Sequence, residues 1–522
     1  MRTIDTDVLV IGSGFGAAAA ALRLSLAGLR VLVAEKGDAI GPNATATLLD
    51  QTAGYRQTQD PGYLTRYLKS AGGEHLKLTF AEALGGGSGF YEMASFRAPS
   101  LAFAQHDESG RPLWPRGLDR AALDPWYDLA EAMLKVRQIS NDEVPRTGLV
   151  FARLMANLGM SCERGRYAVS RCRHSGFCTT GCLYGAKQSL HVNYLAGAVN
   201  AGAVVHCDLE AIDIEPLTDV GRTVPIDRFD RLPYRYQVRC ASRRTGVDEV
   251  CVRARVVVLG GGTVGTAILL LRSRRHLHRI TPHLGRNIAF NGSVKAAALL
   301  APELPDGDMF TGLSHPGMIS YQFLASHGIS VSAVKALPVA AVSGFRLTAD
   351  GGPDSNAWWG EKNVELMRQF RHRAIALLSL GLTPPAGRIE LDANDEPVVK
   401  MEPTPALERY KTTAASVLAS ILTRNGCRLI HADPVNNDGT PHDGMFFSTA
   451  HQTGSARMAD TPRDGVIDPA GEVFHYPGLY VADGAAIPSS LAVNTSLTIL
   501  ANAERIAAGI VKRYHLGAPA GA

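Results

Sequence analysis

The sequence predicts an α/β fold in which a parallel-sheet domain is assembled from discontinuous segments and a second domain is an antiparallel sheet covered by helices. Three observations lead to this prediction. Residues 7–37 read as strand, glycine turn, helix and strand; residues 252–272 repeat the strand–glycine–helix order; and between residues 291 and 430 short β-type runs alternate with turns. Because the first two units are far apart in the chain, one sheet must collect distant segments.

Composition is that of an ordinary globular protein. Of the 522 residues, 46% are hydrophobic and 20% charged, and the net charge is +4. This small charge, without a block of lysines and arginines, argues against nucleic acid as a partner. The apolar runs at 256–271 and 374–382 are too short for a transmembrane segment. The early first strand leaves no room for a signal peptide, and eight cysteines suggest no disulfide framework, so we expect a cytoplasmic protein.

The first unit fits a Rossmann-type dinucleotide site. Val8–Ile11 reads as a buried strand, the next helix runs to about Ala27, and the strand Val31–Ala34 ends in an acid. Glycines in such a turn let N–H groups at a helix N-terminus approach a pyrophosphate, and the acid can accept both hydrogens of a ribose diol. The predicted cofactor contacts are Gly12, Ser13, Gly14, Phe15, Gly16 and Glu35. The alternative is a Gly/Ala-rich helix start with an unrelated surface glutamate.

A second glycine-rich stretch lies at residues 84–88, LGGGS. Successive glycines beside a serine can bring several backbone N–H groups close to a bound anion or ring system. The residues predicted to do so are Gly85, Gly86, Gly87 and Ser88. The alternative is a flexible loop. Residues 37–77, before it, read as a polar, irregular stretch that lies along the nucleotide or acts as a lid.

Further elements follow from hydrophobic spacing. Between the two strand–glycine–helix units we expect helices at 118–134, 151–160 and 188–201, a strand at 203–215 and a polar hairpin at 222–244. In the second domain we expect strands at 293–300, 318–324, 329–342, 389–391 and 398–401, and helices near 363–382 and 405–423.

Cys172, Cys178 and Cys182 lie within eleven positions of the sequence. Thiolates this close can ligate one metal or cluster, and three of them suit a [3Fe–4S] cluster. They do not complete a tetrahedral zinc site, because no histidine is convincingly placed as a fourth ligand. The alternative is three reduced, partly buried thiols in a compact turn, or an incidental disulfide.

Near the C-terminus, Leu479–Asp483 reads as a strand that ends in an acid, and a helix follows at 498–513. The carboxyl ends of strands are where α/β sheets bind ligands. We therefore expect Asp483 to approach a phosphate-linker or ribityl hydroxyl; its alternative role is to cap the following turn.

These segments, in this order, resemble the glucose–methanol–choline (GMC) oxidoreductases, which use FAD. The resemblance runs nearly end to end and rests on the unit at 12–35, the LGGGS loop, the strand and helix at 256–271, and the block beginning HQTGSARM at 451. Residues 185–199 and the final block most resemble the bacterial cholesterol-oxidase branch. The resemblance implies an FAD-binding domain at 1–100, 165–290 and 440–522, and a substrate-binding domain at 101–164 and 291–439.

The resemblance also implies that His451 and Asn494 face the flavin as catalytic residues. Oxidation of an alcohol requires the hydroxyl proton to leave while hydride moves to flavin N5. A neutral imidazole can take or position that proton, and a carboxamide can fix which face of the carbon meets the ring.

The sequence departs from the family pattern at three positions. Thr495 stands where the family commonly has proline after the site asparagine, and Tyr91 stands near the usual asparagine of the glycine loop. Ala333 aligns roughly with a glutamate that moves a proton in cholesterol oxidases, so we expect no coupled isomerisation. Tyr91 and Ala333 are the substrate-pocket candidates.

The three cysteines resemble those of GMC dehydrogenases, some of which hold an iron–sulfur cluster.

The leading hypothesis is FAD-dependent oxidation of an alcohol on a bulky, largely apolar substrate, such as a sterol, terpenoid or long-chain alcohol. Oxygen or an unidentified electron acceptor would reoxidise the flavin. Two alternatives remain open within this fold: isomerisation, elimination or enone reduction in a biosynthetic pathway, or a dehydrogenase that passes electrons through an iron–sulfur cluster. A non-enzymatic flavin-binding module is disfavoured by the presence of His451 and Asn494.

Overall fold

The computed structural model describes residues 2–38, 67–176, 178–180, 182, 184–217, 235–242, 250–309, 311–335, 345–348, 360–434 and 445–515. Most of the irregular stretch expected at 37–77, most of the hairpin expected at 222–244 and the end of the strand expected at 329–342 lie outside these residues. Two strands, β3 (Leu68–Gly72) and β4 (Leu76–Ala81), begin in the described end of the first of these regions, where no strand was expected.

A mixed sheet forms the first domain, and its parallel part is built around β1 (Arg2–Ile11). Val8 is the register partner of Val31 in β2 (Val31–Ala34) and of Val256 in β11 (Val250–Leu259), and both pairings are parallel. Continuous apolar runs such as Val8–Ile11 suit a strand that is covered on both faces. The predicted assembly of one sheet from distant segments is confirmed.

The outer strands complete this sheet. Two further strands form parallel pairs: β8 (Val204–His206) pairs with β2, and β23 (Leu479–Val481) pairs with β11. Two antiparallel strands, β10 (Tyr236–Ser242) and β9 (Leu209–Pro216), extend it beyond β11. The strand predicted at 203–215 is therefore two strands.

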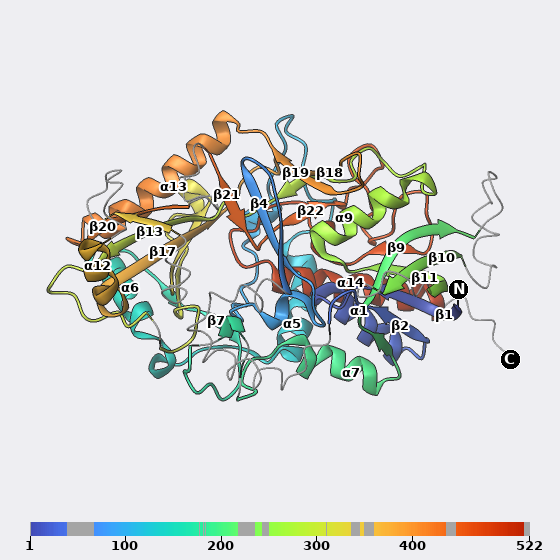
Figure 1. The fold of residues 1–522 in the computed structure, drawn as a ribbon, viewed down its shortest axis with the longest axis horizontal. Helices are drawn as coiled ribbons and strands as arrows, with labels where there is room; N and C mark the ends of the chain where they lie inside the picture. Colours follow the sequence, from blue (N-terminus) through green and yellow to red (C-terminus); the bar gives the residue numbers. More distant parts are fainter. Residues whose placement is uncertain are drawn as a thin grey trace.

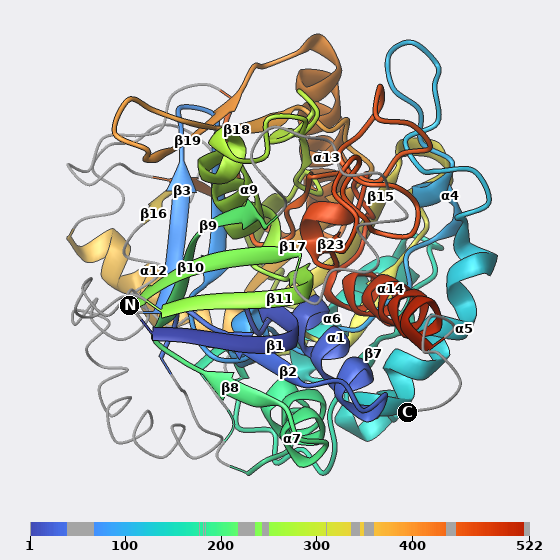
Figure 2. The same cartoon turned by 90° about the vertical axis from the view of Figure 1, so that its right-hand side faces the viewer.

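Helices pack in layers beside this sheet, and Figure 2 shows α1 and α14 next to each other. Helix α1 (Phe15–Leu26) packs on β1 and β2, and α7 (Tyr194–Asn200) and α14 (Ser496–His515) pack on α1. Helix α5 (Arg120–Met133) packs on α14, and α9 (Gly262–Arg272) packs on β9. A buried carboxylate connects three of these helices. Glu504 of α14 pairs with Arg23 of α1 at 2.6 Å and accepts a hydrogen bond of 2.7 Å from Tyr194 of α7.

The second domain is a seven-stranded sheet in which every pairing is antiparallel. In spatial order its strands are β16 (Phe345–Thr348), β20 (Arg428–Pro434), β13 (Val294–Leu299), β17 (Ala374–Gly381), β15 (Ile329–Val334), β14 (Met318–Ser320) and β6 (Glu163–Arg164). Helices α6 (Arg146–Asn157) and α13 (Pro405–Thr423) pack on this sheet, at the left of Figure 1. The predicted fold class, an α/β domain with a helix-covered antiparallel sheet, is confirmed.

One element of this domain was predicted wrongly. The helix expected near 363–382 ends at Arg373, as α12 (Glu361–Arg373), and Ala374–Gly381 is the strand β17. No glycine or proline separates the two, so the apolar run AIALLSLG gave no local sign of the change. Hydrogen bonding to β13 on one side and β15 on the other gives this run its extended conformation.

Smaller sheets join the two domains. The remaining strands are β3 (Leu68–Gly72), β4 (Leu76–Ala81), β5 (Val136–Gln138), β7 (Arg166–Ala168), β12 (Arg286–Ala289), β18 (Gly387–Leu391), β19 (Pro397–Met401), β21 (Phe447–Thr449) and β22 (Thr453–Ser455). The remaining short helices are α4 (Ser100–Phe103), α10 (Leu324–His327), η2 (Gly86–Gly89), η3 (Asn141–Glu143), η4 (Cys178–Thr180), η5 (Leu190–Val192), η6 (Ser273–Arg275) and η7 (Gly484–Ala486). Strands β18 and β19 share a sheet with β12 and β22, so this sheet crosses the domain boundary that we predict at residue 291.

Of the helices that the structure describes, none combines the length and the apolar character needed to cross a membrane.

Candidate functional site

The glycine turn between β1 and α1 has one open side. Gly12 has φ +93°, and an added Cβ on Gly16 would stand 1.8 Å from the carbonyl oxygen of Ala482, so both positions require glycine for the fold itself. An added Cβ on Gly14 would meet nothing closer than 3.9 Å. Gly14 therefore borders open space at the N-terminus of α1, where a pyrophosphate would be expected.

Ser13 connects the turn to two other predicted cofactor contacts. Its hydroxyl donates to the carboxylate of Glu35 at 2.6 Å and accepts from the backbone N–H of Gly85 at 2.8 Å. The other oxygen of Glu35 accepts from the N–H of Gly37 at 2.7 Å. Burial raises the pKa of Glu35. The acid thus stands at the end of β2, as expected, with its side chain fixed from two sides.

The glycine-rich stretch at 84–88 folds against this turn as the short helix η2. An added Cβ on Gly86 would lie 2.9 Å from Cα of Gly14, whereas one on Gly87 would have no neighbour within 4 Å. The buried hydroxyl of Ser88 donates to the carbonyl oxygen of Gly85 at 2.7 Å and accepts from the N–H of Leu190. Open Cα faces at Gly14 and Gly87, on two segments in contact, make a cradle that fits a dinucleotide such as FAD.

Asp483 is in contact with protein groups at both carboxylate oxygens. One oxygen accepts from Thr266 at 2.6 Å and from the N–H of Gly262 at 2.7 Å; the other accepts from the N–H of Ala485 at 2.8 Å. The side chain caps η7 and holds the start of α9, which is the alternative role weighed above. Burial raises its pKa to about 6. Its contact with a cofactor stays a prediction.

Tyr91, a predicted pocket residue, packs beside the glycine turn. Its hydroxyl donates to the carbonyl oxygen of Gln188 at 2.6 Å, and its ring meets that of Phe15 edge-on at 5.3 Å between centroids. The ammonium of Lys187 stands 5.2 Å from the Tyr91 ring centre and donates to the carbonyl oxygens of Gly89 and Cys178, each at 2.7 Å. The structure therefore places Tyr91 beside Phe15, and its contact with substrate stays a prediction.

His451 and Asn494, the predicted catalytic pair, are side by side. The amide nitrogen of Asn494 lies 3.1 Å from Nε2 of His451, and both side chains are half-buried. The backbone N–H of His451 is held by the hydroxyl of Thr449 at 2.9 Å. Because the asparagine amide donates, Nε2 is the acceptor and the imidazole is neutral. Helix α14 begins at Ser496, so its free N–H groups follow the pair directly.

The surroundings keep His451 uncharged. Burial, and after it the positive charge of Lys295, lower its pKa to about 4. A second imidazole, His315, is buried, and this burial is the main cause that lowers its pKa to about 4. Nδ1 of His315 lies 2.6 Å from the hydroxyl of Tyr167, which accepts from the N–H of Gly317. The site therefore presents neutral imidazoles over the physiological pH range.

A buried asparagine sets the loop that carries Asn494. The side-chain oxygen of Asn291 accepts from the N–H groups of Leu491 and Ala492, at 2.8 and 2.9 Å, and its amide donates to the carbonyl oxygen of Val493 at 2.7 Å. The hydroxyl of Ser330 donates to the carbonyl oxygen of Ala492 at 2.5 Å. Ala492 has φ +55°, and these bonds hold it there.

The placement of Ala333 corrects one prediction. Ala333 is fully buried and is the register partner of Leu377, whereas Ser330 and Ser332 alternate with it on β15. Because Ser330 bonds the loop beside Asn494, the face of Ala333 is turned away from the candidate site. A rough alignment could not detect this, since a shift of one residue moves a strand side chain to the other face.

The three clustered cysteines are free and half-buried. Burial raises the pKa of Cys172, and its sulfur accepts from the N–H of His174 at 3.3 Å. In the described segments, which include Cys172, Cys178 and Cys182, no group of three or more His, Cys, Asp or Glu side chains is arranged to hold a metal ion. The iron–sulfur cluster therefore has no support from the described geometry.

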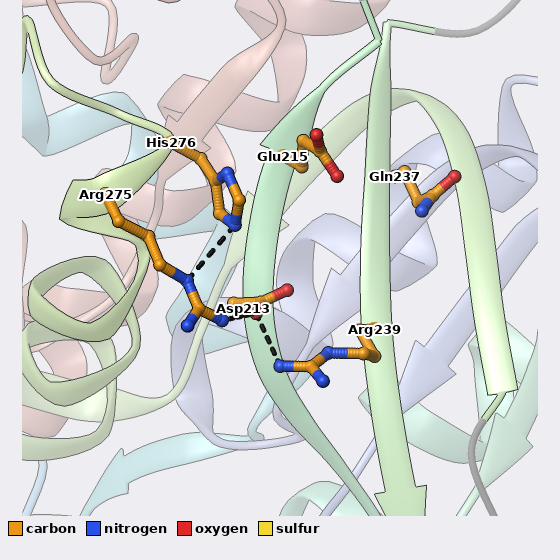
Figure 3. Close-up of a pocket in the computed structure, with 6 residues that line it drawn as sticks. All are labelled: Asp213, Glu215, Gln237, Arg239, Arg275 and His276. Atoms are coloured by element: carbon orange, nitrogen blue, oxygen red, sulfur yellow. Dashed lines mark hydrogen bonds and ion pairs between the residues drawn. The ribbon is translucent and has the colours of Figure 1, made fainter. Parts of the chain in front are cut away.

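A separate surface pocket lies on β9 and β10. It encloses about 400 Å³ and is lined by Asp213, Glu215, Gln237, Arg239, Arg275 and His276 (Figure 3). Within it Asp213 pairs with Arg239 at 2.7 Å and with Arg275. Its charged groups are largely satisfied by one another, and no glycine turn, catalytic-pair residue or cysteine of the cluster lines it. It is not the candidate active site.

Sequence reasoning missed Asn291, His315 and Lys295 at this site. Each stands in an ordinary sequence context, and each reaches the site only through tertiary contacts. The one signal available was Lys295, a charged residue inside an otherwise apolar β-type run at 293–300. Such a residue on an interior strand requires either a partner or an open face.

Comparison with known proteins gives two family-model matches described as GMC oxidoreductase, over residues 6–291 and 384–503. A cholesterol oxidase of Mycobacterium tuberculosis (strain CDC 1551 / Oshkosh) is 28% identical, over 96% of this chain and 90% of its own length. The long-chain-alcohol oxidase FAO4B of Arabidopsis thaliana is 25% identical, over 97% of this chain and 67% of its own.

Solved structures share the fold. A pyridoxine 4-oxidase from Mesorbium loti aligns with a TM-score of 0.64 and 17% identity, covering 98% of this chain and 100% of its own. A formate oxidase from Aspergillus oryzae RIB40 aligns with a TM-score of 0.67 and 14% identity, covering 99% of both chains. At these identities the likeness concerns the arrangement of the chain alone.

Proposed function

The chain belongs to the GMC oxidoreductase family and is an FAD-dependent oxidoreductase, and from this premise we propose that it oxidises an alcohol at the pair His451–Asn494. The observation that carries the proposal is the 3.1 Å contact between Asn494 and Nε2 of His451, at the start of α14. Bound FAD supplies N5 of its ring as the acceptor of the hydride.

His451 and Asn494 have different roles in the rest of the reaction. The neutral imidazole of His451 takes or holds the hydroxyl proton of the alcohol at Nε2, where the substrate hydroxyl would replace the amide N–H of Asn494 as the donor. The low pKa of His451 keeps this nitrogen unprotonated at physiological pH. The amide of Asn494 orients the imidazole and the substrate oxygen, so that the carbon–hydrogen bond to be broken faces the acceptor. The loop bonds of Asn291 support this orientation.

We propose a bulky substrate with a largely apolar body. The names of the relatives, cholesterol oxidase and long-chain-alcohol oxidase, support this class. Ala333 supplies no carboxylate at the position that aligns with the cholesterol-oxidase glutamate, and oxidation without coupled isomerisation is the expected reaction.

We propose oxygen as the acceptor that reoxidises the flavin, since the relatives are named as oxidases. Electron transfer through an iron–sulfur cluster at Cys172, Cys178 and Cys182 is the competing route. Hydrogen peroxide formed in equal amount to the oxidised product supports oxygen. Iron in anaerobically purified protein, with slow reaction toward oxygen, would support the relay instead.

Anaerobic bleaching of the flavin tests the proposed chemistry. A panel of sterol, terpenoid and long-chain alcohols is mixed with the FAD-loaded protein, and the absorbance of oxidised flavin is followed. His451→Gln and Asn494→Asp should retain FAD and slow the bleaching by about 10²-fold or more. His278→Gln, at an exposed histidine, is the control and should bleach like the natural protein. Equal rates in all four proteins would contradict the assignment.

A further inference from the structure

Lys295 is an exposed charge on an interior strand. Its strand, β13, is paired on both sides, with β17 and β20, and the neighbouring Val294 and Ala298 are buried. Neither a hydrogen bond nor an ion pair occupies the ammonium of Lys295 within the part of the chain that the structure describes. A solvated lysine at the edge of a sheet would need no explanation, but an unpartnered one at the centre does.

The side chain of Lys295 stands on the face of the sheet that is turned toward the candidate site. Lys295 is the register partner of Leu378, and Leu378 is the partner of Ser332, so the three share one face. Ser330 belongs to the same face and bonds the carbonyl oxygen of Ala492, two residues before Asn494. The ammonium is close enough for its charge to act on His451.

More positive than negative groups lie around Lys295 when Lys295 itself is counted. The carboxylate of Glu92 also forms no hydrogen bond or ion pair with any described residue, and it feels the positive charges of Lys187, Lys295 and Lys335. Lys187 donates to two carbonyl oxygens, and Lys335 donates to the carbonyl oxygen of Thr311. Three ammonium groups therefore act on the carboxylate of Glu92, and Asp308 acts on Lys335 alone among them. Among the described contacts of the three lysines, Lys295 alone has all its donors free.

We propose that Lys295 binds an anionic group, a carboxylate or a phosphate, on the alcohol that the His451–Asn494 pair oxidises. The inference rests on the proposed function and narrows its substrate to an amphipathic one, with an apolar body and one negative charge within reach of Lys295. A lysine suits this role because its ammonium is a compact point charge with three rotatable donors. The net positive surroundings would also draw such a substrate toward the site.

Matched substrates test the proposal. The FAD-loaded full chain is assayed with ω-hydroxy fatty acids of increasing length, with their methyl esters, and with the corresponding alkanediol monophosphates. The ratio of kcat/KM for acid over ester, and for phosphate over ester, is measured at each length. We expect at least one charged series to be favoured by about 10- to 100-fold. The series that is favoured distinguishes a carboxylate from a phosphate.

Variants connect that preference to Lys295. In Lys295→Met the ratio should fall to near one, and Lys295→Arg should restore most of it. Lys512→Met removes an exposed lysine from the last turn of α14 and should keep the ratio of the natural protein. Esters and acids oxidised equally well by the natural protein would overturn this inference while leaving alcohol oxidation intact.

A binding measurement separates this inference from the proposed chemistry. Saturated fatty acids without the hydroxyl, and alkyl phosphates, are titrated into the holoprotein, and binding is read from the change in the flavin spectrum. We expect Lys295→Met to weaken binding of the favoured anion by about 10-fold or more. Should no alcohol bleach the flavin while these anions still bind through Lys295, the proposed oxidation fails and the anion site stands. Binding that is unchanged in Lys295→Met would overturn the site.

Discussion

The charge state of His451 sets the lower pH limit that we expect for activity. Burial and the charge of Lys295 lower its pKa to about 4, and the proposed step uses the neutral imidazole. With a neutral alcohol as substrate, kcat/KM should hold down to about pH 5 and decline near pH 4. Lys295→Met removes one of the two causes, so its decline should begin at a higher pH, nearer the ordinary value for histidine. Lys512→Met should leave the profile in place; a profile unchanged in both variants would contradict the proximity of Lys295 to His451.

Asn291 is expected to matter for both stability and turnover. Asn291→Ala leaves two buried N–H groups and one carbonyl oxygen of residues 491–493 without their partner, which should lower the free energy of unfolding by about 2–4 kcal/mol. Asn291→Asp keeps the acceptor for Leu491 and Ala492 and loses only the donor to Val493. Its loss of stability in urea unfolding should therefore be smaller, whereas kcat should fall in both. Equal losses in the two variants would argue against this account.

Several residues could be predicted from the sequence and others could not. Ser13, Glu35 and the glycines of both loops lie in local patterns with a known geometric purpose, and the structure brings them together. Asn291 contacts a loop 200 positions away, and nothing near it in the sequence marks that contact. Ala333 failed for a different reason, because an alignment uncertain by one position cannot assign the face of a strand.

Among the elements, the turn from β1 into α1 allows folding and cofactor binding to be tested separately. Gly16→Ala places a Cβ 1.8 Å from the carbonyl oxygen of Ala482, so the sheet must shift and the protein should be poorly folded. Gly14→Ala has no protein atom closer than 3.9 Å and a φ of −68°, so this variant should fold like the natural chain. It fills the cradle, however, and should bind FAD much more weakly. Circular dichroism reads the first effect and FAD titration the second.

Helices and strands were predictable where the hydrophobic period was long or the boundary was marked. Pro405–Thr423 has a threonine cap and a proline at its start, and the predicted helix is the observed one. Ala374–Gly381 has neither, and its neighbours in the sheet decide its conformation. A short apolar run of this kind fits a buried helix or a buried strand equally well when read alone.

For the whole molecule, FAD should act as a stabilising ligand. The predicted cofactor contacts come from residues 12–16, 35, 85–88 and 483, and a ligand that contacts them all favours the folded chain. Stability should rise with the logarithm of FAD concentration, by about 2.7 kcal/mol at a hundredfold excess over Kd. Thermal scans of the flavin-free protein with added FAD measure this rise. Gly14→Ala should show little rise at the same concentrations, and AMP in place of FAD should give a smaller one.

The order of the strands in the first sheet affects how a cell must make this protein. Strand β1 leaves the ribosome early, but its neighbour β11 comes from the middle of the chain and β23 from residues 479–481. At about 5–20 residues per second, roughly half a minute to a minute and a half of translation separates the first strand from the last. Until β11 has been made, the edge of β1 that β11 will cover has no partner, and β11 in turn waits for β23. The nascent chain should therefore be a client of chaperones, and its yield should respond to their supply more than to growth temperature alone.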